Sequence, residues 1–338
     1  MSEKSIERDE FPIEREKVRF QSGEETCVAW HYPGASGACV VMAGGFAVTK
    51  EPATDRFAAR FNQAGFSVLA FDYRRLGEST GRPRQLVRVR EAIEDWDAAI
   101  AFAATLPGVD PAKLAAWAFS ASAGHVFPVA ARNPRLAAAI AQTPLVDAPA
   151  VMPAVVRYST PWAQLRLTGR GLLDAAGGLL GAEPRLVPLV APRGEVAVLS
   201  TPDALDGDRA LNPGNCYPEW RQEVAARSVL RLGLYRPGRH APRIGCPLLV
   251  LVCDDDHSAP PPPAIRAANR APRGELVHLP GGHYAPFLEA HEQAVAIQLE
   301  FLERHLLDRS PAGRAPATAT PAGPNAPTAT PATPAAHV

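Results

Sequence analysis

The sequence has no run of about 18 or more apolar residues, the length that a simple membrane-spanning helix requires. The amino-terminal stretch MSEKSIERDEFPIEREK is charged and lacks the apolar core of a secretory signal. These two absences predict a cytoplasmic protein without a membrane partner.

Cysteine is scarce, and neither sign of charge is in excess. The five cysteines occupy positions 27, 39, 216, 246 and 253, and the only close pair lies along one predicted strand. Neither a disulfide framework nor a zinc site is indicated. Because 35 Lys and Arg residues balance 35 Asp and Glu residues, the charge gives no support to a nucleic-acid or polyanion partner.

Residues 309–338 lack apolar periodicity and consist almost entirely of Pro, Ala, Thr and Gly. Such a composition cannot bury enough surface to offset the entropy of ordering the chain, so we predict a disordered tail. About 300 residues remain, which is enough for one large α/β domain with an inserted subdomain.

Apolar runs typical of strands alternate with helical patterns along most of the chain. The strand-like runs are KVRFQ, TCVAWHY, ACVVMA, FSVLAFDY, LAAWAF, LAAAIAQ, CPLLVLVC and ELVHL. Helices are expected at 55–64, at 86–103, after the LAAWAF strand, at 264–271 and at 295–306. Several strands are apolar on both faces, which predicts an α/β fold with a mostly parallel sheet covered by helices on both faces.

This alternation fails between 149 and 240, where prolines, glycines and short helical pieces such as WRQEVAARSVLRL replace it. We expect a core formed by 1–148 and 241–308, interrupted by an inserted helical cap at 149–240. Long insertions of this kind are often functional lids.

The stretch LAAWAFSASAGHV places two serines directly after a predicted strand. A serine at a sharp turn from strand to helix is the nucleophile in the pattern G-x-S-x-G. Neither serine fits that pattern fully, because Ser120 gives A-F-S-A-S and Ser122 gives S-A-S-A-G. Both are candidates, and the end of the apolar run at Phe119 favours Ser120.

A serine nucleophile also needs a base, an acid that orients the base, and donors for the oxyanion. The candidate acid lies in LVLVCDDDHSAP, where Asp256 stands four residues before Pro260 and Asp254 is the second choice. A metal site formed by this cluster and His257 is disfavoured, because no second set of ligands has a usable spacing.

The candidate base is His283 in LPGGHYAPF, which follows the last predicted strand and two glycines. His125 also lies near the serines, but on the following helix, where we expect it to support packing. The expected oxyanion donors are the amide of Ala121, after Ser120, and that of Phe46 in MAGGFAVTKE, whose glycines permit close backbone approach.

Four stretches together resemble the α/β-hydrolase superfamily: VVMAGGFAVTKE, FDYRRLGESTGRPRQ, VDPAKLAAWAFSASAGH and LPGGHY. They are most similar to its branch of dienelactone-hydrolase-like and X-Pro-dipeptidyl-peptidase-like enzymes, which includes the fungal polyketide transferase group. The resemblance extends from Val18 to near Leu307. It implies an α/β-hydrolase fold with a Ser-Asp-His triad and with neither a cofactor nor a metal.

In that branch the turn reads W-G-x-S-x-x-G-G-H. Aligning this motif with Trp117, Gly124 and His125 makes Ser120 the nucleophile. The branch also usually has a histidine, which orients the oxyanion loop, where this chain has Gly44.

We expect a serine hydrolase that cleaves an ester or thioester of a small-molecule substrate through an acyl-enzyme on Ser120. One alternative uses the same triad to pass the acyl group to an acceptor other than water, or to eliminate a leaving group, in secondary metabolism. The other alternative is a non-catalytic protein of this fold. The sequence indicates no oligomeric state.

The cap is expected to decide which acyl group is accepted. We predict that its apolar residues roof a mainly hydrophobic pocket over Ser120, suited to a medium to large acyl group. These residues are Val151, Met152, Val155, Val156, Trp162, Leu165, Leu172, Leu173, Leu179 and Leu180. A polar pocket would instead use Arg157, Arg166 and Glu223, which could equally lie on the outer face.

Overall fold

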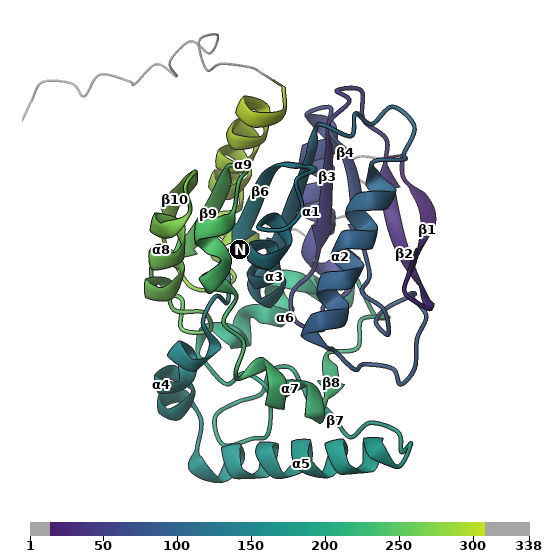
Figure 1. The fold of residues 1–338 in the computed structure, drawn as a ribbon. Coiled ribbons are helices and arrows are strands. Elements are labelled where there is room, and N and C mark those ends of the chain that lie inside the picture. The colour runs from purple at the N-terminus through teal and green to yellow at the C-terminus, as the bar shows by residue number, and fades with distance from the viewer. Residues whose placement is uncertain (1–13, 308–338) are drawn as a thin grey trace, which may run out of the picture.

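The computed structural model describes residues 14–307, in which helices flank an eight-stranded sheet of order β1-β2-β4-β3-β5-β6-β9-β10 (Figure 1). β2 is antiparallel to both β1 and β4, and the remaining neighbours are parallel. The predicted mostly parallel α/β fold is confirmed. The strands are β1 (Glu16–Ser22), β2 (Glu25–Tyr32), β3 (Cys39–Ala43), β4 (Ser67–Phe71), β5 (Leu114–Phe119), β6 (Leu136–Gln142), β9 (Leu248–Cys253) and β10 (Gly274–Leu279).

Helices cover both faces of this sheet. α2 and α3 pack together on one face, and α1 and α9 lie together on the other, where the rings of Phe57 and His291 are 4.9 Å apart (Figure 1). α8 packs on β9 and β10. The bounds are α1 (Lys50–Gln63), α2 (Val89–Ala103), α3 (Ser120–Ala130), α8 (Pro261–Arg270) and α9 (His291–Leu306).

Helix α1 begins earlier than its sequence pattern predicts, at Lys50 rather than near Asp55. The reason is a contact that is remote in sequence. The backbone N–H of Lys50 donates to the Asp72 carboxylate after β4, at 2.8 Å, and a carboxylate at a helix N-terminus satisfies a free donor and favours the helix dipole.

Between β6 and β9 the chain leaves the sheet and forms a separate layer beyond its carboxyl edge (Figure 1). The expected helix WRQEVAARSVLRL is only partly correct, because its first part forms β8, which pairs with β7. The elements are α4 (Ala148–Tyr158), α5 (Pro161–Leu179), β7 (Leu186–Pro188), the 3₁₀ turn η1 (Asp203–Asp206), α6 (Gly207–Leu211), η2 (Pro213–Asn215), β8 (Glu223–Ala225), α7 (Ala226–Leu232) and η3 (Pro237–Arg243).

The predicted tail at 309–338 lies outside the described residues. Within 14–307, no helix combines the length and apolarity needed to cross a membrane.

Candidate active site

Ser120 lies at the turn from β5 to α3, with a backbone φ of 60°. A positive φ is unfavourable for a residue with a side chain, so the turn is strained, as expected where a hydroxyl is held out from a sheet edge. The close packing that this turn requires is provided by Gly124. A Cβ at Gly124 would lie 2.3 Å from the Leu145 carbonyl oxygen.

Ser122 points into the interior instead. It is 1% exposed, and its hydroxyl lies 2.7 Å from the Tyr73 hydroxyl, which also accepts a hydrogen bond from the Trp96 indole at 2.8 Å. Ser122 therefore belongs to a buried network beneath the turn, whereas Ser120 faces a cavity.

Ser120, His283 and Asp256 form one continuous hydrogen-bonded chain. His283 Nε2 lies 2.9 Å from Ser120 Oγ, and His283 Nδ1 lies 2.7 Å from Asp256 Oδ2. The second Asp256 oxygen accepts from the Ala259 N–H at 2.6 Å, which fixes the carboxylate. Asp254, the second choice for the acid, is an exposed side chain that contacts His278 at 2.7 Å.

The environment of His283 favours its protonated form. Burial opposes the charged imidazolium, but the charges of Asp256 and Asp203 and the Asp256 hydrogen bond outweigh it and raise the pKa of His283 above its ordinary value. His125 differs, because burial lowers its pKa to about 4 and its Nδ1 contacts the Tyr235 hydroxyl at 2.8 Å. His125 thus packs behind the turn.

Asp203, in η1, is a residue that the sequence analysis missed. Its Oδ2 accepts from the backbone N–H groups of His257 at 2.8 Å, Ser258 at 3.2 Å and His283 at 3.3 Å. Its Oδ1 accepts from the Ser258 hydroxyl at 3.0 Å. Although burial opposes ionisation, the charge of His283 and these hydrogen bonds hold the pKa of Asp203 below its usual range. One carboxylate therefore ties the β6–β9 layer to the loops that carry Asp256 and His283.

We expect Asp203→Asn to lower kcat/KM by about tenfold, because an amide cannot accept at both of its positions and one buried donor loses its partner. The acid limb of the pH–rate profile should also move to lower pH, since the loss of a nearby negative charge lowers the pKa of His283.

Asp206→Asn is the matched control, because Asp206 lies in the same 3₁₀ turn and, within residues 14–307, forms an ion pair only with the exposed side chain of Arg209. It should leave both the rate and the profile unchanged. An Asp203→Asn profile that coincides with that of the unmodified protein would rule out the electrostatic part of this role.

The shape of the loop after β3 accounts for the glycine at position 44, where the related branch usually has a histidine. A Cβ at Gly44 would lie 2.7 Å from the Val48 carbonyl oxygen and 2.9 Å from that of Thr49, so the loop folds back too tightly for a side chain. The loop is anchored by Lys50, whose Nζ lies 2.9 Å from both Asp72 and Glu78. These contacts hold the end of the loop without a histidine at position 44.

The β6–β9 layer also contacts this loop. Trp220 donates from its indole N–H to the Ala47 carbonyl at 3.1 Å, and Ala47 itself has a positive φ of 56°. The two expected oxyanion donors, Phe46 and Ala121, line the same cavity as Ser120.

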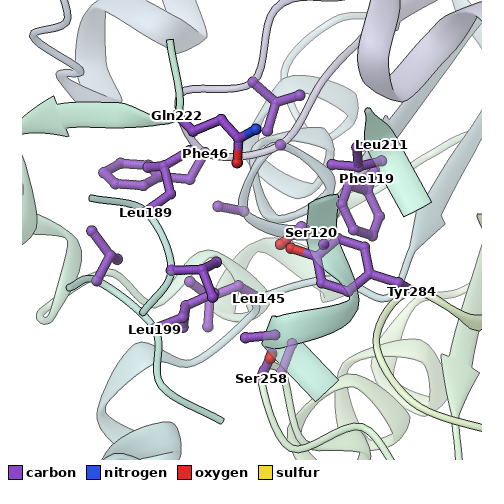
Figure 2. A pocket seen from close by; sticks show the side chains of 18 of the residues that line it. Phe46, Phe119, Ser120, Leu145, Leu189, Leu199, Leu211, Gln222, Ser258 and Tyr284 are labelled. Carbon is purple, nitrogen blue, oxygen red and sulfur yellow. The ribbon is translucent and has the colours of Figure 1, made fainter. Parts of the chain in front are cut away.

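The cavity above Ser120 has a volume of about 220 Å³ and is mainly apolar (Figure 2). Figure 2 shows Ser120 and Tyr284 on one side of it and Leu189 and Leu199 across from them. The β6–β9 layer contributes Leu189, Val198, Leu199, Leu205, Leu211 and Trp220 to the lining.

The prediction of which residues roof the pocket is wrong. The apolar residues predicted at 151–180 do not line the cavity, and the large ones are exposed, with Trp162 64% and Leu179 89% accessible. The cavity is lined instead by the later part of the insertion, because α4 and α5 lie farther from the sheet.

The polar candidates are also placed elsewhere. Arg157 and Arg166 are exposed, and Glu223 does not line the cavity. Besides Ser120 and Tyr284, polar side chains in the lining include Asp208, Gln222 and Ser258, and the amide nitrogen of Gln222 donates to Asp208 at 2.8 Å. Within residues 14–307, no group of three or more His, Cys, Asp or Glu side chains is arranged to hold a metal ion.

The family model described as "Alpha/beta hydrolase family" matches residues 33–298. The chain belongs to the alpha/beta hydrolase family. The hydrolase is 40% identical over 292 residues to the quorum-quenching protein AidA of Acinetobacter baumannii, covering 85% of this chain and 94% of that one.

One further relative supports the expected branch, and one solved structure shares the fold. The hydrolase is 28% identical to the polyketide transferase ATR5 of Stachybotrys chlorohalonatus, over 86% of this chain and 98% of that one. The crystal structure of the alpha/beta hydrolase GrgF from Penicillium sp. superimposes with a TM-score of 0.74 at 24% identity, over 87% of this chain and 99% of that one. The resemblance to the polyketide transferase group is confirmed.

Proposed function

We propose that this hydrolase cleaves an ester or thioester of a medium to large, mainly hydrophobic acyl group through an acyl-enzyme on Ser120. The observation that carries this proposal is the hydrogen-bonded chain from Ser120 through His283 to Asp256 at the wall of an apolar cavity. A nucleophile, a base and an orienting acid in contact are the requirement for this chemistry.

In the proposed reaction, Ser120 Oγ attacks the substrate carbonyl carbon while its proton passes to His283 Nε2. The negative charge on the carbonyl oxygen is stabilised by the amides of Phe46 and Ala121. The bond to the leaving alcohol or thiol then breaks, and that group takes the proton from His283. A water molecule then gives a proton to His283 and attacks the acyl-enzyme carbonyl carbon. The bond to Ser120 Oγ breaks, Ser120 takes the proton back from His283, and the carboxylic acid is released.

A fluorophosphonate probe tests the catalytic proposal directly, because it reacts with an activated serine. Labelling at Ser120, identified by mass spectrometry of the labelled peptide, is the expected result. An unlabelled but folded protein would favour the non-catalytic alternative.

The apolar lining predicts a preference for longer acyl chains. We expect kcat/KM for p-nitrophenyl esters to rise from acetate to octanoate by up to about fourfold per methylene, since each buried methylene contributes about 0.8 kcal/mol. A steady fall along the series would show that the pocket is small or polar.

A cavity variant sharpens this test. Leu199→Trp should lower kcat/KM for octanoate by about tenfold, the loss of roughly two buried methylenes, while acetate is unaffected. Leu234→Trp is the matched control, because Leu234 is 79% exposed and does not line the cavity.

Acyl transfer is the second candidate, and the full-length similarity to a protein named a polyketide transferase favours it. Product analysis with and without an added alcohol or amine distinguishes transfer from hydrolysis.

Quorum quenching is a candidate role for either chemistry, because the similarity to AidA extends over 94% of that protein. Loss of signal activity from an acyl lactone, read by a reporter strain, tests that role.

A further inference from the structure

Within residues 14–307, eight of the ten large apolar side chains that are exposed lie on α4, on α5 or just after α5. Figure 1 shows α5 at the foot of the described chain, farthest from the sheet. The large apolar side chains exposed on α4, on α5 and just after α5 are Met152, Val156, Trp162, Leu165, Leu172, Leu173, Leu179 and Leu180. Large apolar patches are unusual on the surface of a soluble monomer and often mark interaction sites.

Helix α5 has two apolar faces, and only one of them is used within the chain. Ala163, Leu167 and Gly171 are buried against α7, where a Cβ at Gly171 would lie 3.0 Å from Leu230. At about 100° per residue, the exposed side chains of Trp162, Leu165 and Leu172 lie on the opposite side of the helix. These side chains therefore contribute nothing to the core of their own chain.

The exposed stripe has the spacing of a helix–helix seam. Successive positions are separated by three, four, three, four and three residues, as in the a and d positions of a heptad. They are Trp162, Leu165, Gly169, Leu172, Ala176 and Leu179. This spacing reads the same in both directions about a point between Arg170 and Gly171, as a twofold-symmetric contact between identical helices requires.

The residue sizes fit the same symmetry. With two α5 helices antiparallel about that point, Leu165 faces Ala176 of the partner subunit and Gly169 faces Leu172 of the partner subunit. In these two pairs a large side chain meets a small one. At each end of the seam, Trp162 meets Leu179 of the partner subunit. A Cβ at Gly169 meets no atom within 4 Å, so the space beside Gly169 is open to a partner's side chain.

We propose that this hydrolase forms a twofold-symmetric dimer in which α5 packs antiparallel against α5 of a second copy. This interface does not depend on the proposed catalytic activity. Arg166 and Arg170 beside the stripe would also suit an anionic lipid surface. The self-complementary spacing and sizes favour a second copy, because a lipid surface imposes neither.

Size-exclusion chromatography with light scattering of the full chain tests the proposal. The expected mass is twice the 36.0 kDa of one chain, and Leu172→Asp should give the monomer mass with an unchanged circular dichroism spectrum. Arg170→Asp is the matched control, because Arg170 is exposed on α5 outside the stripe, and it should stay dimeric. A monomeric unmodified protein, or a dimeric Leu172→Asp, would overturn the proposal.

Gly169→Leu provides a second test that does not depend on introducing a charge. Leucine favours a helix more than glycine, and the site is open in one chain, so the variant should fold with an unchanged circular dichroism spectrum. It should nevertheless dissociate, because it fills the space for Leu172 of the partner subunit. A Gly169→Leu dimer as tight as the unmodified one would contradict the proposed packing.

An unmodified protein that is monomeric and floats with phosphatidylcholine–phosphatidylglycerol vesicles would instead identify the stripe as a lipid-binding surface.

Discussion

Ser120→Ala is expected to lower kcat/KM by about 10⁴-fold or more and to abolish fluorophosphonate labelling, because removal of the nucleophile disables the whole catalytic unit. The hydroxyl of Ser120 is the one that lies 2.9 Å from His283 Nε2, at a strained turn facing the cavity. The measurement is ester hydrolysis under matched conditions, together with the mass of the labelled peptide.

Ser122→Ala is the control for this experiment, because it changes the same atom two residues away. The Ser122 hydroxyl lies 2.7 Å from that of Tyr73 and is buried. We expect most of the activity to remain, labelling to persist, and the free energy of unfolding to fall by about 1 kcal/mol, the typical contribution of one hydrogen bond. The reverse outcome for the two serines would assign the nucleophile to Ser122.

Asp256→Asn is expected to lower kcat/KM by about 10³–10⁴-fold, and His283→Ala by at least as much. The amide that replaces the Asp256 carboxylate would lack the charge that stabilises the imidazolium formed when Ser120 attacks. The Asp256→Asn variant should still fold, since an amide oxygen can accept the Ala259 N–H now bound at 2.6 Å.

The pH dependence gives a second measurement on the same pair. Because the neutral imidazole is the proposed base and the pKa of His283 is raised, activity should fall as the pH drops through a value above the ordinary imidazole pKa. In Asp256→Asn this acid limb should move to lower pH, since the anion that favours the imidazolium is gone. Asp254→Asn, on the exposed aspartate near His278, should change neither the rate nor the limb. Equal, small losses from both variants would exclude Asp256 as the orienting acid.

Local patterns in the sequence were sufficient to predict the sheet, and together with the family resemblance they predicted the three residues of the proposed catalytic chain. Strands such as β3 and β9 are short runs of buried apolar residues, and such runs are recognisable without knowing their neighbours. The three residues, Ser120, Asp256 and His283, each lie at or shortly after the carboxyl end of a strand. Because these strand ends lie along one edge of a parallel sheet, the three side chains are expected to lie close together. The structure brings these side chains into contact.

The later part of the insertion was not predictable in the same way. Asp203 and Trp220 act through contacts with residues far away in the sequence, such as His283 and Ala47. Neither residue belongs to a motif with a fixed spacing. The start of α1 at Lys50 has the same origin, because the carboxylate that caps it follows a different strand.

The sequence by itself determined the fold class and the family, and it predicted which residues are the proposed nucleophile, acid and base, because each of these depends on short-range patterns. It also determined that α4 and α5 are rich in apolar residues. Only the tertiary structure decided which way those residues face. A helix with apolar residues on two sides, such as α5, can bury either one, and packing of Leu167 and Gly171 on α7 turns Trp162 and Leu172 outward. The pocket is therefore lined by the loops and short elements after α5, whose contacts with the sheet edge no local pattern encodes.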